Sequence, residues 1–438
     1  MPPTLTFRTA LRYWLKLGFI SFGGPAGQIA MMHAELVERR RWISERRFLH
    51  ALNYCMVLPG PEAQQLATYI GWLLHGVRGG IAAGALFVLP SLGILIALSW
   101  IYMAFGQVPA VAGVLWGIKP AVTAIVLHAA WRIGKRTLTH PALWAIALAS
   151  FVAIAVVALP FPLIILGAAA VGGLGGRLRP GWFGAAPAHA TPALEPAGAD
   201  QSPASALEVA RSPRRVPILR TAAVGVGMWL LAIGLLHAAF GAVGLLVQMA
   251  WFFSKAALLT FGGAYAVLPY VAQAAVQQYG WLTAPQMIDG LALGETTPGP
   301  LIMVVAFVAF VGGWTHPVAG VAPAAAAVAA AVVVTFFTFL PSFVFILVGG
   351  PVVEATRGDL KFTAPLVAIT AAVVGVILNL ALFFAWHVLW PLGRDGPFEW
   401  GALAIGLAAA VALIRYGAGV VKVILVCAAL GLIRTLVL

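Results

Sequence analysis

The sequence predicts an all-α membrane protein that crosses the bilayer many times, and three observations lead to this prediction. Of the 438 residues, 62% are hydrophobic and only 9% are charged, whereas about a quarter of the residues of a soluble domain carry a charge. Apolar runs of about twenty residues, enough for roughly ten to thirteen helical spans, recur from Leu66 to the C-terminus. A segment of the first half also returns, without a gap, in the second half.

The basic residues form short clusters between the apolar runs. The positive-inside rule places such clusters in cytoplasmic loops, so we assign the net charge of +13 to membrane topology and not to nucleic-acid binding. No cleavable signal is recognisable before the first apolar run, because Arg8, Arg12 and Lys16 interrupt that segment. We therefore expect a retained, cytoplasmic N-terminus in a multi-pass membrane protein.

The internal repeat is the most informative feature. An offset of 239 residues (22 onto 261) aligns Phe22-Gly23-Gly24 with Phe261-Gly262-Gly263, and Pro59-Gly60-Pro61 with Pro298-Gly299-Pro300. After a short insertion in the second half, Leu89-Pro90-Ser91 resembles Leu340-Pro341-Ser342. Each half of the chain is therefore predicted to contain one copy of the same unit.

The repeat divides the chain into three parts. Residues 1–176 form the first repeat, and residues 218–438 form the second repeat with an extra leading apolar segment, Leu219 to Phe240. Residues 177–217 are rich in Pro, Ala and Arg and are expected to be a flexible cytoplasmic linker.

The charges predict that the two repeats have opposite orientations in the membrane. Bases crowd the loop between the two motifs of the first half, at Arg39, Arg40, Arg41, Arg46 and Arg47, whereas the aligned residues 278–286 contain none. Residues 104–110 are uncharged, but the corresponding stretch of the second half carries Arg357 and Lys361. The extra apolar segment adds one more membrane crossing before the second repeat, so that this repeat enters the membrane from the opposite side. Inverted repeats of this kind are typical of transporters.

Pro-Gly-Pro within an apolar segment predicts a broken helix in each half. Proline removes a backbone donor and clashes with the preceding turn. A helix that restarts after Pro61 or Pro300 presents free amide groups and the positive end of its dipole inside the membrane, and such ends bind anions. The alternative is a packing kink without a ligand.

Phe-Gly-Gly suggests the same chemistry. Adjacent glycines allow unusual backbone angles, so that amide groups can point at an oxyanion. The alternative is close helix packing through small residues. The first apolar stretch, Leu17 to Met32, is short for a span, and a broken helix or re-entrant hairpin is as consistent with it as a simple crossing. We predict a single anion site formed by Phe22, Gly23, Gly24, Pro59, Gly60, Pro61, Phe261, Gly262, Gly263, Pro298, Gly299 and Pro300.

Charged residues within apolar segments are few and are candidates for function. Lys255 and Lys119 could attract a dianion, although each could instead extend to the membrane interface. Glu62 and Glu295 could bind a coupling proton, with Glu62 alternatively complementing the helix dipole.

Arg46 and Arg47 could form an electrostatic funnel, although the membrane topology of the chain explains these two bases better. No nucleophile elbow, metalloprotease motif or phosphate loop is present, so we predict neither an enzyme nor an ATP-driven pump. Cys55 and Cys427 lie far apart in apolar sequence and predict no metal site, and no cofactor is indicated.

Several segments together resemble the long-chain chromate transporter family. They are Phe22-Gly-Gly-Pro-Ala-Gly-Gln28, Trp42-Ile-Ser44, Leu58 to Gly71, Phe87-Val-Leu-Pro-Ser91, Thr260 to Gly263, and Gly294 to Pro300. The resemblance covers both halves outside the linker. It implies a bacterial plasma-membrane protein that exports chromate and confers chromate resistance, with sulfate as a mimic or competitor.

Three alternatives stay open at this stage. A permease for sulfate or another oxyanion would use the same tetrahedral dianion chemistry, an anion channel would use the same pore, and a membrane scaffold or membrane enzyme would move no anion at all. Neither the coupling ion nor the oligomeric state follows from the sequence, which is compatible with a homodimer.

Overall fold

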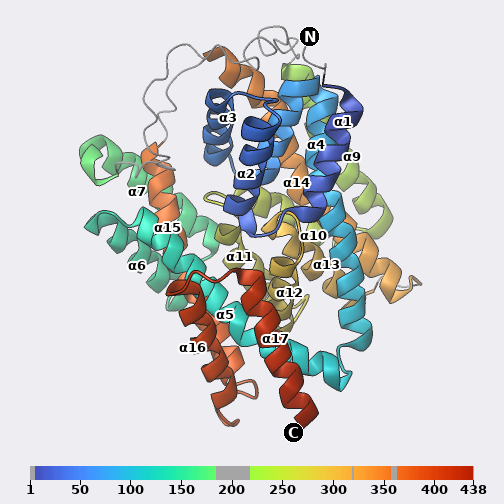
Figure 1. Cartoon of the computed structure of the whole chain (residues 1–438), viewed down its shortest axis with the longest axis vertical. Helices are drawn as coiled ribbons and strands as arrows, with labels where there is room; N and C mark the ends of the chain where they lie inside the picture. The colour runs from blue at the N-terminus through green and yellow to red at the C-terminus, as the bar shows by residue number, and fades with distance from the viewer. Residues whose placement is uncertain (1–4, 184–217, 318–319, 357–362, 438) are drawn as a thin grey trace.

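The computed structural model describes residues 5–183, 218–317, 320–356 and 363–437, and within these ranges all regular secondary structure is helical (Figure 1). Seven helices are long and apolar enough to cross a membrane. Four shorter apolar helices accompany them, at Pro141–Ala155, Leu245–Leu258, Leu301–Thr315 and Trp400–Ile414. The prediction of an all-α, multi-pass membrane protein is confirmed. The predicted number of spans is reached only if the shorter helices are counted.

Each half begins with the same series of short helices. In the first half these are α1 (Phe7–Ile20), α2 (Gly24–His33), the π-helix η1 (Ala34–Arg39) and α3 (Glu45–Val57). In the second half they are α10 (Leu245–Leu258), α11 (Ala264–Ala272), the π-helix η3 (Gln273–Gln278) and α12 (Ala284–Thr296). The breaks before α2 and α11 fall at the Phe-Gly-Gly motifs.

A helical hairpin follows in each half. The helix α4 (Glu62–Phe105) turns back at His75 and Gly76, where Gly76 has φ +64°. Its two arms pack antiparallel, because a Cβ placed on Gly71 would stand 2.5 Å from the Cβ of Ala83. In the second half, η4 (Leu301–Met303) and α13 (Val304–Thr315) form the first arm and α14 (Pro323–Thr356) forms the second.

The first arms are short and completely enclosed. Every residue from Ala63 to Leu73 is buried, as is every residue from Leu301 to Gly313. Non-helical backbone at membrane depth is tolerated where protein covers it. The enclosure therefore explains how chain breaks can precede Glu62 and Leu301 within an apolar region.

The remaining helices interlock the two halves. The order α5 (Pro109–Thr137), α6 (Pro141–Ala155) and α7 (Phe161–Leu178) recurs as α15 (Thr363–Leu389), α16 (Trp400–Ile414) and α17 (Val420–Val437). The helix α5 packs against α16 and α17, whereas α15 packs against α6 and α7. Each half thus completes its packing with helices of the other half, and Figure 1 shows α5 beside α16 and α17.

The extra apolar segment forms α9 (Ile218–Phe240), which packs on the outside of α10 and α14. The indole N–H of Trp229 donates to Ser254 Oγ at 2.9 Å, and otherwise α9 exposes large apolar side chains along most of its length. The helix α7 continues two residues into the predicted linker and is followed by the short 3₁₀ helix η2 (Pro180–Trp182). Linker residues 184–217, and Arg357 and Lys361, lie outside the described residues.

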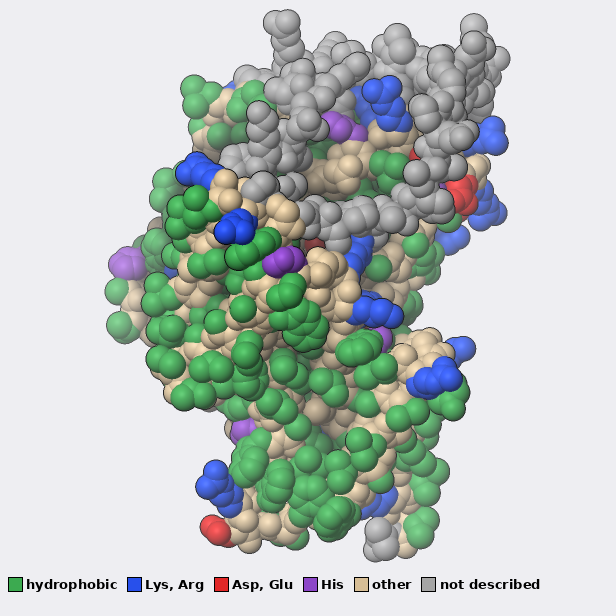
Figure 2. All heavy atoms as spheres, turned by 90° about the vertical axis from the view of Figure 1, so that its left-hand side faces the viewer, with side chains coloured by type: hydrophobic (Ala, Val, Ile, Leu, Met, Phe, Trp, Pro, Cys, Tyr) green, Lys and Arg blue, Asp and Glu red, His purple; other side chains and the backbone are tan. Residues whose placement is uncertain are grey.

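The exterior has the polarity expected of a membrane protein. Figure 2 shows hydrophobic side chains over the middle and lower part of one face, with most Lys and Arg side chains in its upper half and a few at its lower end. Exposed large apolar residues such as Leu148, Leu231 and Leu430 belong to helices that surround the core. These surfaces fit a hydrocarbon environment.

Candidate functional site: the crossing of the two repeats

The two Pro-Gly-Pro loops each hydrogen-bond to the Phe-Gly-Gly segment of the opposite half. The Gly60 N–H donates to the Thr260 carbonyl oxygen at 2.7 Å, and the Gly299 N–H donates to the Ser21 carbonyl oxygen at 3.0 Å. Gly60 and Gly299 are equivalent in the repeat, and so are Ser21 and Thr260. The contact is therefore reciprocal, as it is across a two-fold axis. We call this meeting of four loops the crossing.

The residues at the crossing explain its backbone shape. Gly60 has φ +128° and Gly299 has φ +108°, a region that side-chain-bearing residues rarely adopt. The flanking prolines fix φ and prevent continuation of the helix. In consequence α3 ends at Val57 and α4 begins at Glu62, while α12 ends at Thr296 and η4 begins at Leu301.

The serines of the two Leu-Pro-Ser segments also reach the crossing. A Cβ on Gly60 would stand 2.5 Å from Ser342 Oγ, and a Cβ on Gly299 would stand 2.7 Å from Ser91 Cβ. Both serines come from the half opposite to the glycine that they contact, and both are buried. Sequence analysis used these segments only to extend the repeat and missed their place at the site.

Helix N-termini surround the crossing. The helix α2 starts after Gly23, α11 after Gly263, α4 after Pro61 and η4 after Pro300, and none of the four has a side-chain cap. The first amide groups of a helix have no partner within the helix, and the dipole makes that end positive. The arrangement provides hydrogen-bond donors and positive potential without a permanent charge.

Polar side chains from the first half line the same region. The side-chain amide of Gln28 donates to the carbonyl oxygens of Gly299 at 2.5 Å and Ser21 at 3.1 Å. Gln65 donates to the Pro59 carbonyl oxygen at 2.7 Å. The Ser21 hydroxyl is fully buried and has no hydrogen-bond partner. These residues were missed as well, although polar residues within the apolar stretch after Pro61 were a usable signal.

The predicted residues of the site differ in accessibility. Gly60, Pro61, Gly263, Pro298, Gly299 and Pro300 are buried, Gly24, Pro59 and Phe261 are half-buried, and Phe22, Gly23 and Gly262 are exposed. The Phe-Gly-Gly side of the crossing is therefore open and the Pro-Gly-Pro side closed.

Both predicted acids lie beside these loops. A Cβ on Gly263 would stand 3.6 Å from Glu62 Oε1, so the Glu62 carboxyl group faces the start of α11. Glu295 is buried in α12 and accepts a hydrogen bond from the Tyr265 hydroxyl at 2.5 Å. The Glu62 carboxyl group thus lies beside the start of α11.

The predicted bases are placed less favourably. Lys255 has an exposed side chain on α10. Lys119 is paired with the carboxylate of Asp289, with 3.5 Å between Nζ and Oδ2, so an acid of this protein already compensates its charge. Arg46 and Arg47 occupy the first turn of α3, about 15 Å along the helix axis from Val57. None of these predicted bases lies among the loops of the crossing. Two arginines of α5 that were not predicted, Arg136 and Arg132, act electrostatically on the Glu62 and Glu295 carboxyl groups beside it.

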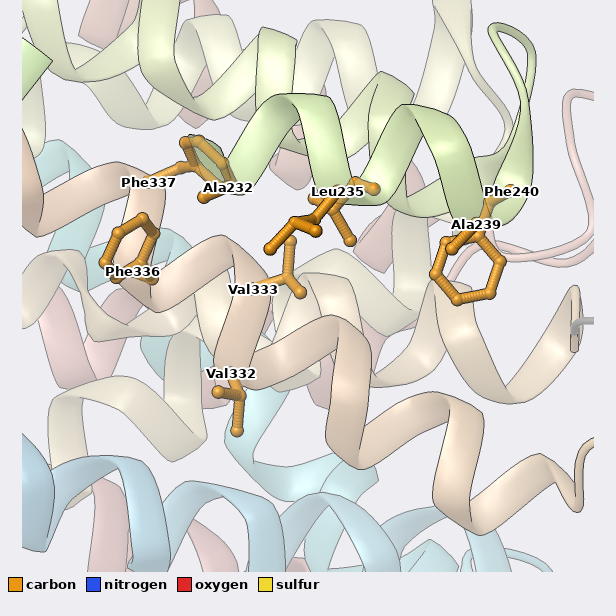
Figure 3. Close-up of a pocket in the computed structure, with 9 residues that line it drawn as sticks. Ala232, Leu235, Ala239, Phe240, Val332, Val333, Phe336 and Phe337 are labelled. Atoms are coloured by element: carbon orange, nitrogen blue, oxygen red, sulfur yellow. The ribbon is translucent and has the colours of Figure 1, made fainter. Parts of the chain in front are cut away.

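An apolar groove of about 460 Å³ lies elsewhere, between α9 and α14. Figure 3 shows that hydrocarbon side chains line it, among them Leu235, Phe240, Val333 and Phe336. Such a lining offers no donor to an oxyanion, and no residue of the repeated motifs contributes to it. We therefore place the candidate site at the crossing and not in this groove.

Comparisons with known proteins agree with the repeated architecture. The sequence pattern of the family described as "Chromate transporter" matches residues 9–174 and 247–432. The "Chromate transport protein" of Pseudomonas aeruginosa is 33% identical over 381 residues, which cover 86% of this chain and 80% of that protein. The protein of the same description from Cupriavidus metallidurans is 28% identical over 384 residues, covering 87% and 84%.

A "Probable chromate transport protein" of Synechococcus elongatus is 27% identical over 421 residues, covering 95% of this chain and 92% of that protein. No solved structure matches the chain significantly. The match of the family pattern to both halves, together with these relatives, shows that the chain belongs to the chromate transporter family.

Proposed function

We propose that this chain exports chromate across the bacterial inner membrane through one anion site at the crossing. Membership of the chromate transporter family supports the cargo, and the multi-pass helical fold supports transport across a bilayer. The observation that carries the site is the pair of reciprocal hydrogen bonds from Gly60 to Thr260 and from Gly299 to Ser21.

The site would bind the dianion mainly through neutral donors. Chromate is a tetrahedral oxyanion, and the uncapped starts of α2, α4 and α11 offer amide groups from several directions. The unpartnered Ser21 hydroxyl adds a donor. Sulfate has the same shape and charge, so we expect sulfate to compete for the site.

The proposed site keeps the twelve glycine, proline and phenylalanine positions of the two repeated motifs. It adds Ser21, Gln28 and Gln65, which contact the same loops. It leaves out Lys119 and Lys255, because the first is paired with Asp289 and the second is exposed. Positive charge near the site comes from Arg136 and Arg132 of α5, which act on the Glu62 and Glu295 carboxyl groups.

We also propose that the two repeats are inverted with respect to the membrane and that transport alternates the access to the crossing. The exchanged packing of α5 with α16 and α17, and of α15 with α6 and α7, supports a pseudo-two-fold relation. In transporters built this way, one repeat moves against the other around a fixed central site.

Glu62 is the proposed gate. Its carboxylate lies near the start of α11, where it competes with the dianion for the same amide groups. The substitution Glu62→Gln makes this side chain neutral and should remove the competition. We expect the half-saturating chromate concentration to fall several-fold, as measured from initial transport rates over a series of chromate concentrations. An unchanged or higher half-saturating concentration would remove Glu62 from this role.

The membrane potential favours export. Moving each negative charge out of a cell with a negative interior is favourable by about 2.3 kcal/mol at 100 mV. In everted vesicles, whose lumen corresponds to the outside, a lumen-positive potential should drive chromate inward. No chemical step and no bound cofactor is needed for this movement.

The test is uptake of radiolabelled chromate into everted vesicles with and without the protein, with the potential and the pH gradient collapsed separately. We expect saturable uptake that depends on the potential and is inhibited by sulfate. Flux that does not saturate would instead support an anion channel, and sulfate uptake that chromate does not inhibit would support a sulfate permease. Uptake equal to that of empty vesicles would refute the proposal.

A further inference from the structure

A buried ion pair lies outside the motifs that form the crossing. Asp289 stands in the middle of α12, and its side chain is 2% exposed. Its Oδ2 accepts a hydrogen bond from the Tyr102 hydroxyl at 3.0 Å and lies 3.5 Å from Lys119 Nζ. The second carboxylate oxygen, Oδ1, is buried without a hydrogen-bond partner. Three helices, α4, α5 and α12, therefore meet at one acid.

The position of this pair within the bilayer gives it significance. Lys119 follows the start of α5 by ten residues, which places it about 15 Å along a membrane-spanning helix. Removing both charges of an ion pair from water is costly, and a well-packed apolar pair is often more stable. Ionisable residues at such depth commonly mark ion pathways.

The surroundings leave Asp289 with two charged or titratable neighbours, Lys119 and Tyr102. Among the elements packed against α12, η4 and α13 contain no titratable residue. On α15, His387 hydrogen-bonds through Nδ1 to the Phe383 carbonyl oxygen, and on α17, Arg434 pairs with Glu399. The helix α17 also carries Lys422 and Cys427. On α5, Arg132 acts on Glu295 and Arg136 acts on Glu62. On α12 itself, Glu295 is engaged with Tyr265.

We propose that Asp289 is the proton-binding site that couples proton movement to anion transport. This inference rests on the proposed function. As a carboxylate, Asp289 holds α12 against α4 and α5 through Tyr102 and Lys119. A proton taken from water neutralises the carboxylate and removes its attraction to Lys119, so α12 is released. Deprotonation to the opposite side restores the pair.

The link to transport is the chain that follows α12. This helix ends at Thr296, three residues before Gly299, whose N–H forms one of the two crossing hydrogen bonds. Release of α12 therefore frees one side of the crossing to move. The Lys119 side chain is 28% exposed, so the pair is not completely enclosed by protein.

A proton fits this site better than a metal ion. The Lys119 ammonium group stands 3.5 Å from the carboxylate and would repel a cation at the same place. Within the described residues, no group of three or more His, Cys, Asp or Glu side chains could hold a metal. A single carboxylate oxygen with no partner suits one proton and does not supply the several oxygen ligands of a hard cation.

The experiment uses the purified full-length protein in liposomes with a pH-sensitive dye inside, and it has two readouts. The first is exchange of labelled chromate at equal concentrations on both sides, which needs the anion site but no net proton movement. The second is proton movement driven by a chromate gradient. We expect both from the wild type. For Asp289→Asn we expect exchange to persist, while proton movement falls to the level of liposomes without protein, because an amide side chain does not take up a proton in this pH range.

A second variant protects the test against misfolding. Asp289→Asn leaves Lys119 buried without its partner, whereas the double variant D289N/K119Q removes both charges and avoids an uncompensated ion. It should also retain exchange and lose proton movement. The matched control is Asp395→Asn on the exposed segment between α15 and α16, which should keep both activities.

Several results would overturn the inference. Wild-type exchange without proton movement would refute proton coupling but leave the proposed chromate transport intact, whereas absence of wild-type exchange would refute the transport proposal itself. If Asp289→Asn and D289N/K119Q both still moved protons, the Asp289–Lys119 pair would be only a structural contact. Loss of chromate exchange in both variants would lead to the same conclusion. Loss of proton movement in Glu62→Gln or Glu295→Gln, but not in Asp289→Asn, would assign the coupling to another acid.

Discussion

The helices α1 to α3 and their counterparts α10 to α12 have nearly identical lengths but lie in different surroundings. In the first unit, Arg39 is 79% exposed, and Glu35 pairs with Arg40 at 2.5 Å, which lowers the pKa of that carboxyl group. In the second unit, η3 contains no charged residue and α11 is almost entirely buried. The same backbone unit therefore carries exposed charges in the first half, whereas in the second half it is uncharged along η3 and buried along α11.

A second contrast concerns the crossing itself. Its backbone is symmetric, but its polar side chains are not. Gln28 and Gln65 of the first half correspond to Val267 and Val304 of the second half. Conversely, the buried Asp289 corresponds to the half-buried His50. In our proposal, the repeated backbone forms the anion site, and the side chains that differ between the halves give each half its own task.

The prediction with the largest expected effect concerns the orientation of the two repeats in the membrane, and its outcome is all-or-none labelling. If the repeats are inverted, Arg39→Cys and Gln278→Cys, at equivalent exposed positions, should react with a membrane-impermeant thiol reagent from opposite sides of the membrane. The two native cysteines are buried and give little background. Labelling of both variants from the same side would show that the repeats are parallel.

The next effect tests the symmetry of the crossing. Gly60→Ala and Gly299→Ala should each reduce chromate exchange by about a hundredfold, because strain of roughly 1–3 kcal/mol at positive φ adds to a clash with Ser342 or Ser91. Exchange rates in liposomes measure this. Gly93→Ala is the control, since a Cβ there meets nothing within 4 Å. Loss of activity in only one of the two variants would break the equivalence of the halves.

A smaller effect tests the chemical difference between the halves. Gln28→Val makes the first half resemble the second and leaves the Gly299 and Ser21 carbonyl oxygens without this donor. We expect a loss of stability of about 1–3 kcal/mol and a several-fold weaker affinity for chromate. Thermal unfolding and the half-saturating concentration report the two effects separately. Native-like values of both would show that the glutamine is dispensable.

The smallest expected effect concerns the electrostatic funnel predicted for Arg46 and Arg47. Neutralising both bases in R46Q/R47Q should slow chromate uptake two- to fivefold at low salt, and roughly 0.5 M salt should abolish the difference by screening. Initial rates at two ionic strengths provide the measurement. A defect that persists at high salt would indicate a direct contact or altered topology in place of a funnel.

Sequence patterns were sufficient to predict the membrane class, the repeated motifs and the positions of the chain breaks. Composition and apolar runs depend on the solvent that a chain must face, and glycine and proline act on the local backbone. The breaks between Ser21 and Gly24 and between Leu58 and Pro61 could therefore be predicted from residue types alone.

Only the tertiary structure decided which residues contact the loops at those breaks. That Gly60 bonds to Thr260, that Ser342 approaches Gly60, and that Lys119 meets Asp289 are contacts between residues far apart in sequence. Lys119 appeared in the sequence as an isolated cation because its acid lies 170 residues later on another helix. Local residue chemistry determined where the chain must break and what it could bind. The packing of helices from both halves determined which loops meet and which charges are already compensated.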